Sequence, residues 1–562
     1  MSGRLEVAYQ LIMHATTPLL TMLMLIVPLL PLLLNLAASS RRRGNNGGKK
    51  LPPSPPALPI IGHLHLVGDL PHVSLRDLAA SHGRDGLMLL RLGAVPNLIV
   101  SSPSAARAVL RTHDHVFASR PASAIADALM YGPSSDMGFA PYGEHWRQAR
   151  KLVTTHLFTV KKVHSYRHDR EEEVRLVMAK MRESAAASTA AVDMSEAMNA
   201  FANDVVTRAV SGKLFWAEGR NKLFRELVGI NAALFGGFNL EEYFPGLASS
   251  LGFLSRWFPR NRQARHAHKR WDELLETIIS DHELERRHSI SMPCRDFTDV
   301  LLSVQQEYGL TRDHTKAILI DLFNAGTDTS SLVLELAMAE LMRNPQHMTK
   351  LQGEVRKHTP EGQEMVEEEN LASMPYLRAV VKETLRLHPP APLLLPHLAM
   401  ADCTVVVGDG AYSIPSGTRV IVNAWAISRD PESWEKPDEF MPERFMDGGS
   451  AAAVDFKGSD FEFLPFGAGR RICPGLNFAL ATVEIMLANL LYCFEWELPN
   501  GMEAEDVDTT EVFGLTIHPK EKLMLFPKPR GTSTGGGHSM QAEAADPERS
   551  IVPRGGNGPN LY

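Results

Sequence analysis

The chain has 562 residues, of which 44% are hydrophobic and 22% are charged, so it can bury a large core and fold as a globular protein. The formal net charge of −7 lacks the basic excess that binding to a polyanion requires, which argues against a nucleic-acid partner. The four cysteines form neither a C-x-x-C pair nor a disulfide framework, so we expect a reducing compartment and no zinc site; they are Cys294, Cys403, Cys473 and Cys493.

The N-terminal region carries a candidate membrane segment. Residues 18–38 contain no charged side chain and match the length of roughly 20 apolar residues that crosses a bilayer. A cleaved signal peptide is the alternative, but the apolar run is long and lacks a clean small-residue cleavage site. We therefore predict that residues 1–50 form a single-pass membrane anchor with a basic flank. That flank places the rest of the chain in the cytosol and consists of Arg41, Arg42, Arg43, Lys49 and Lys50.

The remainder of the chain divides by composition. Residues 51–59 are rich in proline and predict an extended, stiff hinge. Residues 60–528 contain no repeat and no second linker, so we predict one catalytic domain there, while the Gly-, Ser- and Pro-rich residues 529–562 predict a disordered tail. Helical patterning dominates the domain, which indicates a mainly α fold with small β-sheets. The short β-like runs are residues 87–92, 98–101 and 418–423.

A helix is predicted over residues 311–343, with Thr311 as its N-cap and Asn344-Pro345 as its end. It contains Ala325-Gly326-Thr327-Asp328-Thr329-Ser330, although glycine costs about 1 kcal/mol relative to alanine inside a helix. Gly326 would let a ligand lie against the backbone, and Thr329 can hydrogen-bond a carbonyl one turn back. Taken alone, the motif favours a capped helix break with solvated polar residues.

The most informative segment is a glycine-rich loop over residues 466–475 that contains Cys473 and leads into a helical pattern over residues 476–491. A helix start behind a cysteine supplies backbone N–H groups and positive potential that stabilise a thiolate, the form that binds iron. The glycines allow a flat macrocycle to approach the backbone, and Phe466 is placed to cover the sulfur.

This loop matches F-x-x-G-x-R-x-C-x-G, and the sequence here resembles the cytochrome P450 family over about residues 50–528. The resemblance implies the cytochrome P450 fold and a bound haem b (iron protoporphyrin IX), with Cys473 as the axial thiolate and therefore the iron ligand. Thiolate ligation in that family favours cleavage of the O–O bond. The enzyme class implied is an oxidoreductase, a monooxygenase that incorporates oxygen from O₂.

The resemblance also assigns roles to other residues. It implies that Asp328 and Thr329 relay protons, and that Trp146, Arg150 and Arg471 bind the haem propionates, for which the planar guanidinium fork is suited. His397 departs from the family pattern, since plant members usually carry arginine there, so its propionate contact is less supported. A buried structural network is implied for Glu383, Arg386 and Arg444.

Several short strings, among them Phe513-Gly514-Leu515-Thr516, look like the plant microsomal A-type (71-clan-like) members, which implies an endoplasmic reticulum membrane and its lipid as the setting. The chain has no flavin or nicotinamide fingerprint. Electrons must therefore come from outside, and the resemblance implies that NADPH-cytochrome P450 reductase, with its FAD and FMN, supplies them and docks near Arg470.

The substrate is expected to be small and lipophilic. Residues 152–158 and 238–240 are similar to grass enzymes that hydroxylate indole-derived intermediates of benzoxazinoid defence compounds. By resemblance, a mostly apolar pocket that holds its substrate by shape is predicted from residues 121–137, 201–237, 322–325, 391–395 and 513–515.

Two alternatives stay open at this point. One is a haem-thiolate isomerase or dehydratase that needs neither O₂ nor a reductase. The other is a non-catalytic haem-binding membrane protein. The acid and alcohol at Asp328 and Thr329 would have no evident task in either, so the sequence favours the monooxygenase.

Overall fold

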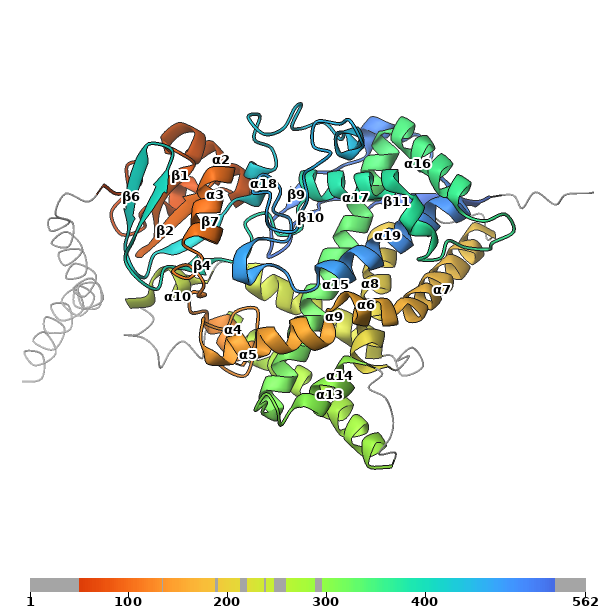
Figure 1. The fold of residues 1–562 in the computed structure, drawn as a ribbon, viewed down its shortest axis with the longest axis horizontal. Coiled ribbons are helices and arrows are strands. Elements are labelled where there is room, and N and C mark those ends of the chain that lie inside the picture. Colours follow the sequence, from red (N-terminus) through yellow and green to blue (C-terminus); the bar gives the residue numbers. More distant parts are fainter. Residues whose placement is uncertain are drawn as a thin grey trace, which may run out of the picture.

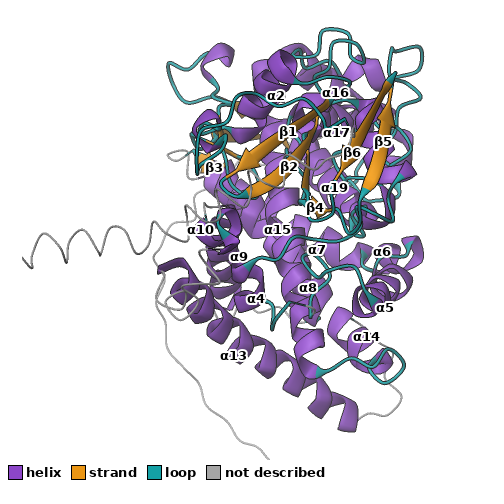
Figure 2. Ribbon diagram, turned by 90° about the vertical axis from the view of Figure 1, so that its left-hand side faces the viewer, coloured by secondary structure: helices purple, strands orange, loops and turns teal. Residues whose placement is uncertain are grey.

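A computed structural model describes residues 50–133, 135–186, 191–212, 220–236, 239–246, 259–288 and 296–530. The predicted membrane segment and almost all of the predicted tail lie outside the described residues. Within them, helices form most of the molecule; several strands lie together at the left of Figure 1, and the remaining short strands lie among the helices (Figures 1 and 2). The predicted mainly α fold with small sheets is confirmed.

The helices vary widely in length. They are α2 Pro71–His82, α3 Pro103–Arg107, α4 Ala124–Leu129, α5 Glu144–Leu152, α6 Val160–Ser165, α7 Arg167–Ala186, α8 Met194–Ser211, α9 Arg220–Gly236, α10 Leu240–Tyr243, α13 Pro259–His288, α14 Phe297–Val304, α15 Arg312–Arg343, α16 Pro345–His358, α17 Pro375–Leu387, α18 Ala424–Ile427 and α19 Leu476–Cys493.

Four small sheets accompany these helices in the described residues, with strand orders β1-β2-β7-β4, β5-β6, β3-β11-β8 and β9-β10. β1 and β2 form an antiparallel hairpin, and β7 joins β2 in parallel. The three β-like runs expected from the sequence correspond to β1, β2 and β7. The strands are β1 Leu87–Leu92, β2 Val95–Val100, β3 Val192–Asp193, β4 His397–Leu398, β5 Cys403–Val407, β6 Gly410–Ile414, β7 Arg419–Val422, β8 Phe494–Glu497, β9 Glu511–Val512, β10 His518–Pro519 and β11 Met524–Pro529.

The long central helix α15 begins and ends as the sequence predicts. The Thr311 hydroxyl accepts a hydrogen bond from the backbone N–H of His314 at 3.1 Å. The His314 side chain accepts one from the Thr311 amide, and together these bonds form a capping box. The helix stays continuous through Ala325–Ser330 and ends at Arg343. It therefore carries its polar motif through the middle of the molecule (Figure 1).

The structure adds a second reason for glycine at position 326. α8 packs along α15, and a Cβ at Gly326 would lie 2.7 Å from Cγ2 of Val206. Real Cβ contacts are not that short, so a larger residue at this position would force Val206 to shift, and glycine allows the two helices to pack closely. Gly326 also lines the central cavity, where the sequence predicts that a ligand lies against its backbone.

The predicted network of Glu383, Arg386 and Arg444 is confirmed. Arg386 on α17 donates to Glu383 at 2.8 and 2.9 Å, and Arg444 donates to it at 3.0 Å. All three side chains are 0% exposed. Further N–H groups of Arg386 donate to the Ser428 and Pro437 carbonyls, so the network ties α17 to the segment that precedes the cysteine loop.

Helix α19 follows the cysteine loop and is, among the described residues, the single helix long and apolar enough to cross a bilayer. It is mostly buried, because α7, α15, α16 and α17 pack around it. It is therefore a core helix, and its apolar character reflects burial inside the protein.

Candidate active site

The cysteine loop turns sharply enough to present one sulfur atom. Gly469 adopts φ +69°, and a Cβ there would lie 2.3 Å from the Leu110 carbonyl oxygen, so no other residue fits without a shift of the backbone. The Cys473 amide donates to the Phe466 carbonyl at 2.9 Å and closes the loop. These constraints fix the position of the thiol.

The surroundings of the Cys473 sulfur suit a metal-bound thiolate. Burial raises the pKa of the Cys473 thiol in the protein alone, whereas N–H groups of Gly475 and Leu476 and the charge of Arg150 lower it. The residue is partly exposed although it lies deep in the molecule, because its free side faces an internal cavity. A metal cation in that cavity would deprotonate the thiol outright.

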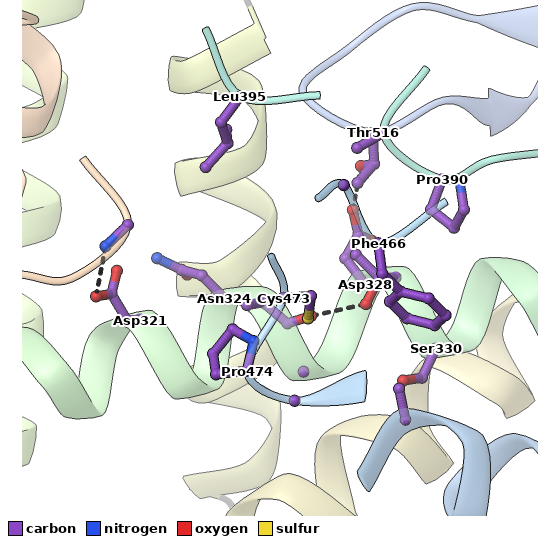
Figure 3. Close-up of a pocket in the computed structure, with 18 of the residues that line it drawn as sticks. Asp321, Asn324, Asp328, Ser330, Pro390, Leu395, Phe466, Cys473, Pro474 and Thr516 are labelled. Carbon is purple, nitrogen blue, oxygen red and sulfur yellow. Dashed lines mark hydrogen bonds between the residues drawn. The ribbon is translucent and has the colours of Figure 1, made fainter. Parts of the chain in front are cut away.

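That cavity encloses about 350 Å³ between the cysteine loop and α15 (Figure 3). Each of the five segments expected to form the pocket contributes to its wall. Representative lining residues are Met137, Val206, Leu322, Ala391 and Leu515. Ala325 is exposed although it sits in the middle of α15, because it faces this space. The wall is predominantly apolar, as expected.

One end of the cavity is rich in buried cations. The Trp146 indole donates to the Met137 carbonyl at 3.1 Å, and the Arg471 guanidinium lies 4.2 Å from the centre of the Trp146 ring. Arg471 donates to the carbonyls of Ala118 and Ala140, and Arg150 donates to the Ile472 carbonyl at 2.5 Å. The structure therefore brings Trp146, Arg150 and Arg471 to the same end.

A third buried arginine, which the sequence reasoning missed, joins them. Arg120 donates to the carbonyls of Gly138 at 3.0 Å, Leu395 at 2.8 Å and Pro396 at 2.9 Å. It is 7% exposed and lines the cavity. In the sequence, Arg120 is a single charged residue between Ala118-Ser119 and Pro121. That pattern is too common to indicate a binding site.

This cation cluster fits a group with two carboxylates. Burial lowers the pKa of Arg120 and Arg150 and lowers that of Arg471 to about 10, because little water reaches the three guanidinium groups. Among the described residues, none of the three has a carboxylate within ion-pair distance, although the charges of Asp136 and Asp321 reach Arg471 from farther away and that of Asp136 also reaches Arg120. Buried charges are normally paired. The propionates of a haem held by Cys473 would supply the missing partners.

The opposite wall is the polar notch of α15. The Thr329 hydroxyl donates to the Ala325 carbonyl at 2.7 Å, which confirms the predicted bond one turn back. Asp328 is 8% exposed, and its carboxylate accepts a hydrogen bond from the Thr516 hydroxyl (Figure 3). The notch and the Cys473 sulfur thus line the same cavity.

Comparison with known proteins decides the family. The model of the family described as Cytochrome P450 matches residues 52–526. The chain belongs to the cytochrome P450 family. It is 57% identical to the indole-2-monooxygenase of Zea mays, over 85% of this chain and 87% of that protein. It is 55% identical to the indolin-2-one monooxygenase of Zea mays, over 85% of this chain and 89% of that protein.

Solved structures agree with this assignment. A zebra fish cytochrome P450 structure with progesterone matches at a TM-score of 0.68 and 26% identity, covering 82% of this chain and 99% of that chain. The predicted P450 fold, the haem-thiolate monooxygenase class and the haem cofactor are thereby confirmed for this P450. The roles given above to individual residues stay predictions.

His397 of this P450 is buried and neutral. Its Nδ1 lies 2.8 Å from the Phe117 carbonyl, an acceptor, so Nδ1 carries the proton. Burial and the nearby Arg120 lower the pKa of His397 to about 3. The one proton of the neutral ring is therefore used on Phe117, and Arg120 supplies a charge at this end of the cavity instead. The predicted contact of His397 with a propionate stays a prediction.

Polar groups inside the P450 pocket were also missed. Asn231 on α9 donates from Nδ2 to Oδ1 of Asn324 on α15 at 3.1 Å. The remaining Oδ1 of Asn231 and Nδ2 of Asn324 are buried without a partner among the described residues. Asp321 accepts from the Met137 and Gly138 amides at 2.7 and 3.1 Å and so fastens that loop to α15. Burial raises the pKa of Asp321.

Arg470, expected on the reductase-facing surface of the P450, is tied down within its own chain. It donates to Asp114 at 2.6 Å and to the Tyr142 hydroxyl at 2.7 Å. Its side chain is one third exposed. The neighbouring carboxylate offsets much of the charge that Arg470 would present to a partner.

Proposed function

We propose that this P450 inserts one oxygen atom from O₂ into a small, lipophilic, indole-derived substrate, with electrons that NADPH delivers through NADPH-cytochrome P450 reductase. One observation carries the proposal: the same mostly apolar cavity is lined by Cys473 of the cysteine loop and by Asp328 and Thr329 of α15. The named activities of the maize relatives, indole-2-monooxygenase and indolin-2-one monooxygenase, support the substrate class.

The chain itself supplies the environment for this chemistry. Bound haem would provide the site of O₂ activation, with Cys473 as its thiolate and with Arg120, Arg150, Trp146 and Arg471 at its propionates. The apolar wall, which includes the stacked rings of Phe139 and Phe235 with centroids 4.4 Å apart, excludes water and orients a flat substrate.

Asp328 and Thr329 are proposed to hold and move protons. The cleavage of O₂ to give product and water consumes protons, and both residues line the cavity. Thr329 keeps its hydroxyl fixed on the Ala325 carbonyl, while the buried Asp328 carboxylate is the nearer group to the outer loop that contains Thr516. The pair therefore bridges the cavity and the outer shell of the protein.

We further propose that residues 18–38 anchor the protein in the endoplasmic reticulum membrane, with the catalytic domain in the cytosol. The uncharged run and the basic residues after it support this orientation. It would place the domain beside a membrane-bound reductase. Fluorescent fusions and protease protection of microsomes test the placement, and a protected catalytic domain would contradict it.

The activity is tested with microsomes that contain the full chain and the reductase. Indole and indolin-2-one are supplied as probes, and hydroxylated products are measured by mass spectrometry. Oxidation that requires both NADPH and O₂ is the expected result. Product formed without either would instead point to an isomerase or dehydratase, and no product from any indole-type probe would overturn the substrate class.

Ligation is tested by spectroscopy, independently of substrate. Reduced wild-type protein with carbon monoxide should show the red-shifted Soret band of thiolate-bound haem, and Cys473→Ala should lose it. Cys493→Ala is the matched control, because Cys493 is buried at the end of α19 and away from the cavity lining. A band that survives in Cys473→Ala would remove this cysteine as the ligand.

A further inference from the structure

The carboxylate proposed to deliver protons, Asp328, has an unexplained partner that reaches solvent. His518 on β10 places its Nε2 at 3.2 Å from Oδ2 of Asp328. The Asp328 side chain is 11% exposed, whereas that of His518 is 45% exposed. One residue of this pair therefore lies inside the protein and the other at its surface.

Thr516 completes a short hydrogen-bonded cluster. Its hydroxyl donates to Oδ2 of Asp328 and lies 3.1 Å from Nε2 of His518. Because its proton is used on the carboxylate, the hydroxyl oxygen can accept from a protonated imidazole. A proton on Nε2 of His518 thus faces two acceptor oxygens, Oδ2 of Asp328 and the hydroxyl oxygen of Thr516, which is itself bonded to Asp328.

We propose that His518 is the proton-entry residue of this P450, passing protons from solvent to Asp328 for the reaction. The inference rests on the proposed monooxygenase function. In each transfer the Nε2–H bond of the imidazolium breaks, an O–H bond forms on Asp328, and the histidine becomes neutral. The carboxyl group then gives up that proton toward the cavity and is again a carboxylate. Rotation of the half-exposed ring returns Nε2 to solvent for reprotonation.

The surrounding charges keep His518 protonated and Asp328 ionised between transfers, so a proton waits beside the carboxylate and moves onto it only as the reaction draws protons into the cavity. Burial lowers the pKa of His518, but its bond to Asp328 and the charges of Asp328 and Glu335 outweigh that effect and raise it overall. The Asp328 pKa is correspondingly lowered. Other charged groups on the packed elements are engaged elsewhere. They are Asp193 with Lys522, and Glu511 on the paired strand β9 with His72 and His388, while Glu335 acts on His518 by its charge and also accepts from the Ser195 hydroxyl.

The sign of the pH dependence follows. At a pH below its raised pKa, His518 is protonated and ready to donate, and above that pKa it is neutral and delivery slows. The fraction of NADPH that ends in product should therefore be high near pH 6 to 7 and should fall as the pH rises, with hydrogen peroxide taking its place.

The decisive experiment compares the full-length wild type, His518→Gln and His518→Lys in reductase-containing microsomes. Product and hydrogen peroxide per NADPH are measured with indole between about pH 6 and pH 8.5, and in H₂O and D₂O. Lysine keeps a cation beside Asp328 but does not titrate in this range. We expect both variants to lose most of the pH dependence and to lower coupling several-fold, with the carbon monoxide band intact.

His82→Gln serves as the matched control, because His82 is an exposed histidine at the end of α2. Its pH profile should match that of the wild type. A His518→Lys enzyme with wild-type coupling and an unchanged profile would overturn the proton-entry role. That result differs from failure of the proposed function, in which the wild type itself would show no NADPH-dependent oxidation.

Discussion

The Glu383 carboxylate balances two buried guanidinium groups, and we predict that Glu383→Gln destabilises the protein far more than its small change in shape suggests. Arg386 and Arg444 donate to both carboxylate oxygens, and the Met441 amide donates to Oε1 at 2.8 Å. Glutamine replaces one accepting oxygen with an NH₂ group that faces these donors. It also leaves two buried positive charges without a counter-charge.

The magnitude follows from that geometry. Removing one partner of a fully buried ion pair costs about 3–5 kcal/mol. An unfolding entropy of about 2 cal/mol/K per residue gives roughly 1 kcal/mol/K for a domain of about 480 residues. The melting temperature should therefore fall by about 3–5 °C, and haem should be lost at a lower temperature because the network supports the segment before the cysteine loop.

Differential scanning calorimetry of the haem-loaded protein, with the Soret band followed in parallel, measures this effect. Asp77→Asn is the matched control, since Arg76 and Asp77 form an ion pair at 2.8 Å whose side chains are 42% and 62% exposed. An exposed pair contributes about 0–1 kcal/mol, which corresponds to less than about 1 °C. Equal shifts for Glu383→Gln and Asp77→Asn would refute the reasoning.

Three further predictions concern the cavity. Thr329→Ala should shift NADPH from product toward hydrogen peroxide, on the order of tenfold or more, because the hydroxyl at the notch is lost; unchanged coupling would remove Thr329 from the mechanism. Arg120→Ala should release haem on dilution while Arg120→Lys retains most of it, as measured by the Soret band, and equal retention in both would exclude a charge-based role. Asn324→Leu should lower kcat/KM for indolin-2-one about tenfold more than for indole. The lactam of indolin-2-one can use both the free donor, Nδ2 of Asn324, and the free acceptor, Oδ1 of Asn231. A lost hydrogen bond costs about 1.5 kcal/mol, which corresponds to about tenfold. Equal losses of kcat/KM for the two probes would show that Asn231 and Asn324 do not bind the carbonyl group of the substrate.

The sequence by itself determined the features whose causes are local. The cysteine loop is recognisable because a sulfur, its glycines and the following helix start lie within a few residues of one another. The limits of α15 follow from Thr311 and from Asn344-Pro345, and the hydrogen bond of Thr329 spans one helical turn. The Glu383 network was predictable from the family pattern because Glu383 and Arg386 share one recognisable motif and Arg444 sits in a second.

Tertiary structure decided what depends on residues far apart in the chain. Arg120 reaches Leu395, and Asp328 meets His518, only after folding. Gly326 packs closely against Val206 on another helix, a contact that no local pattern records. The neutral state of His397 depends on its burial beside Arg120. Packing distance and loss of water set these properties, and both arise when distant segments come together.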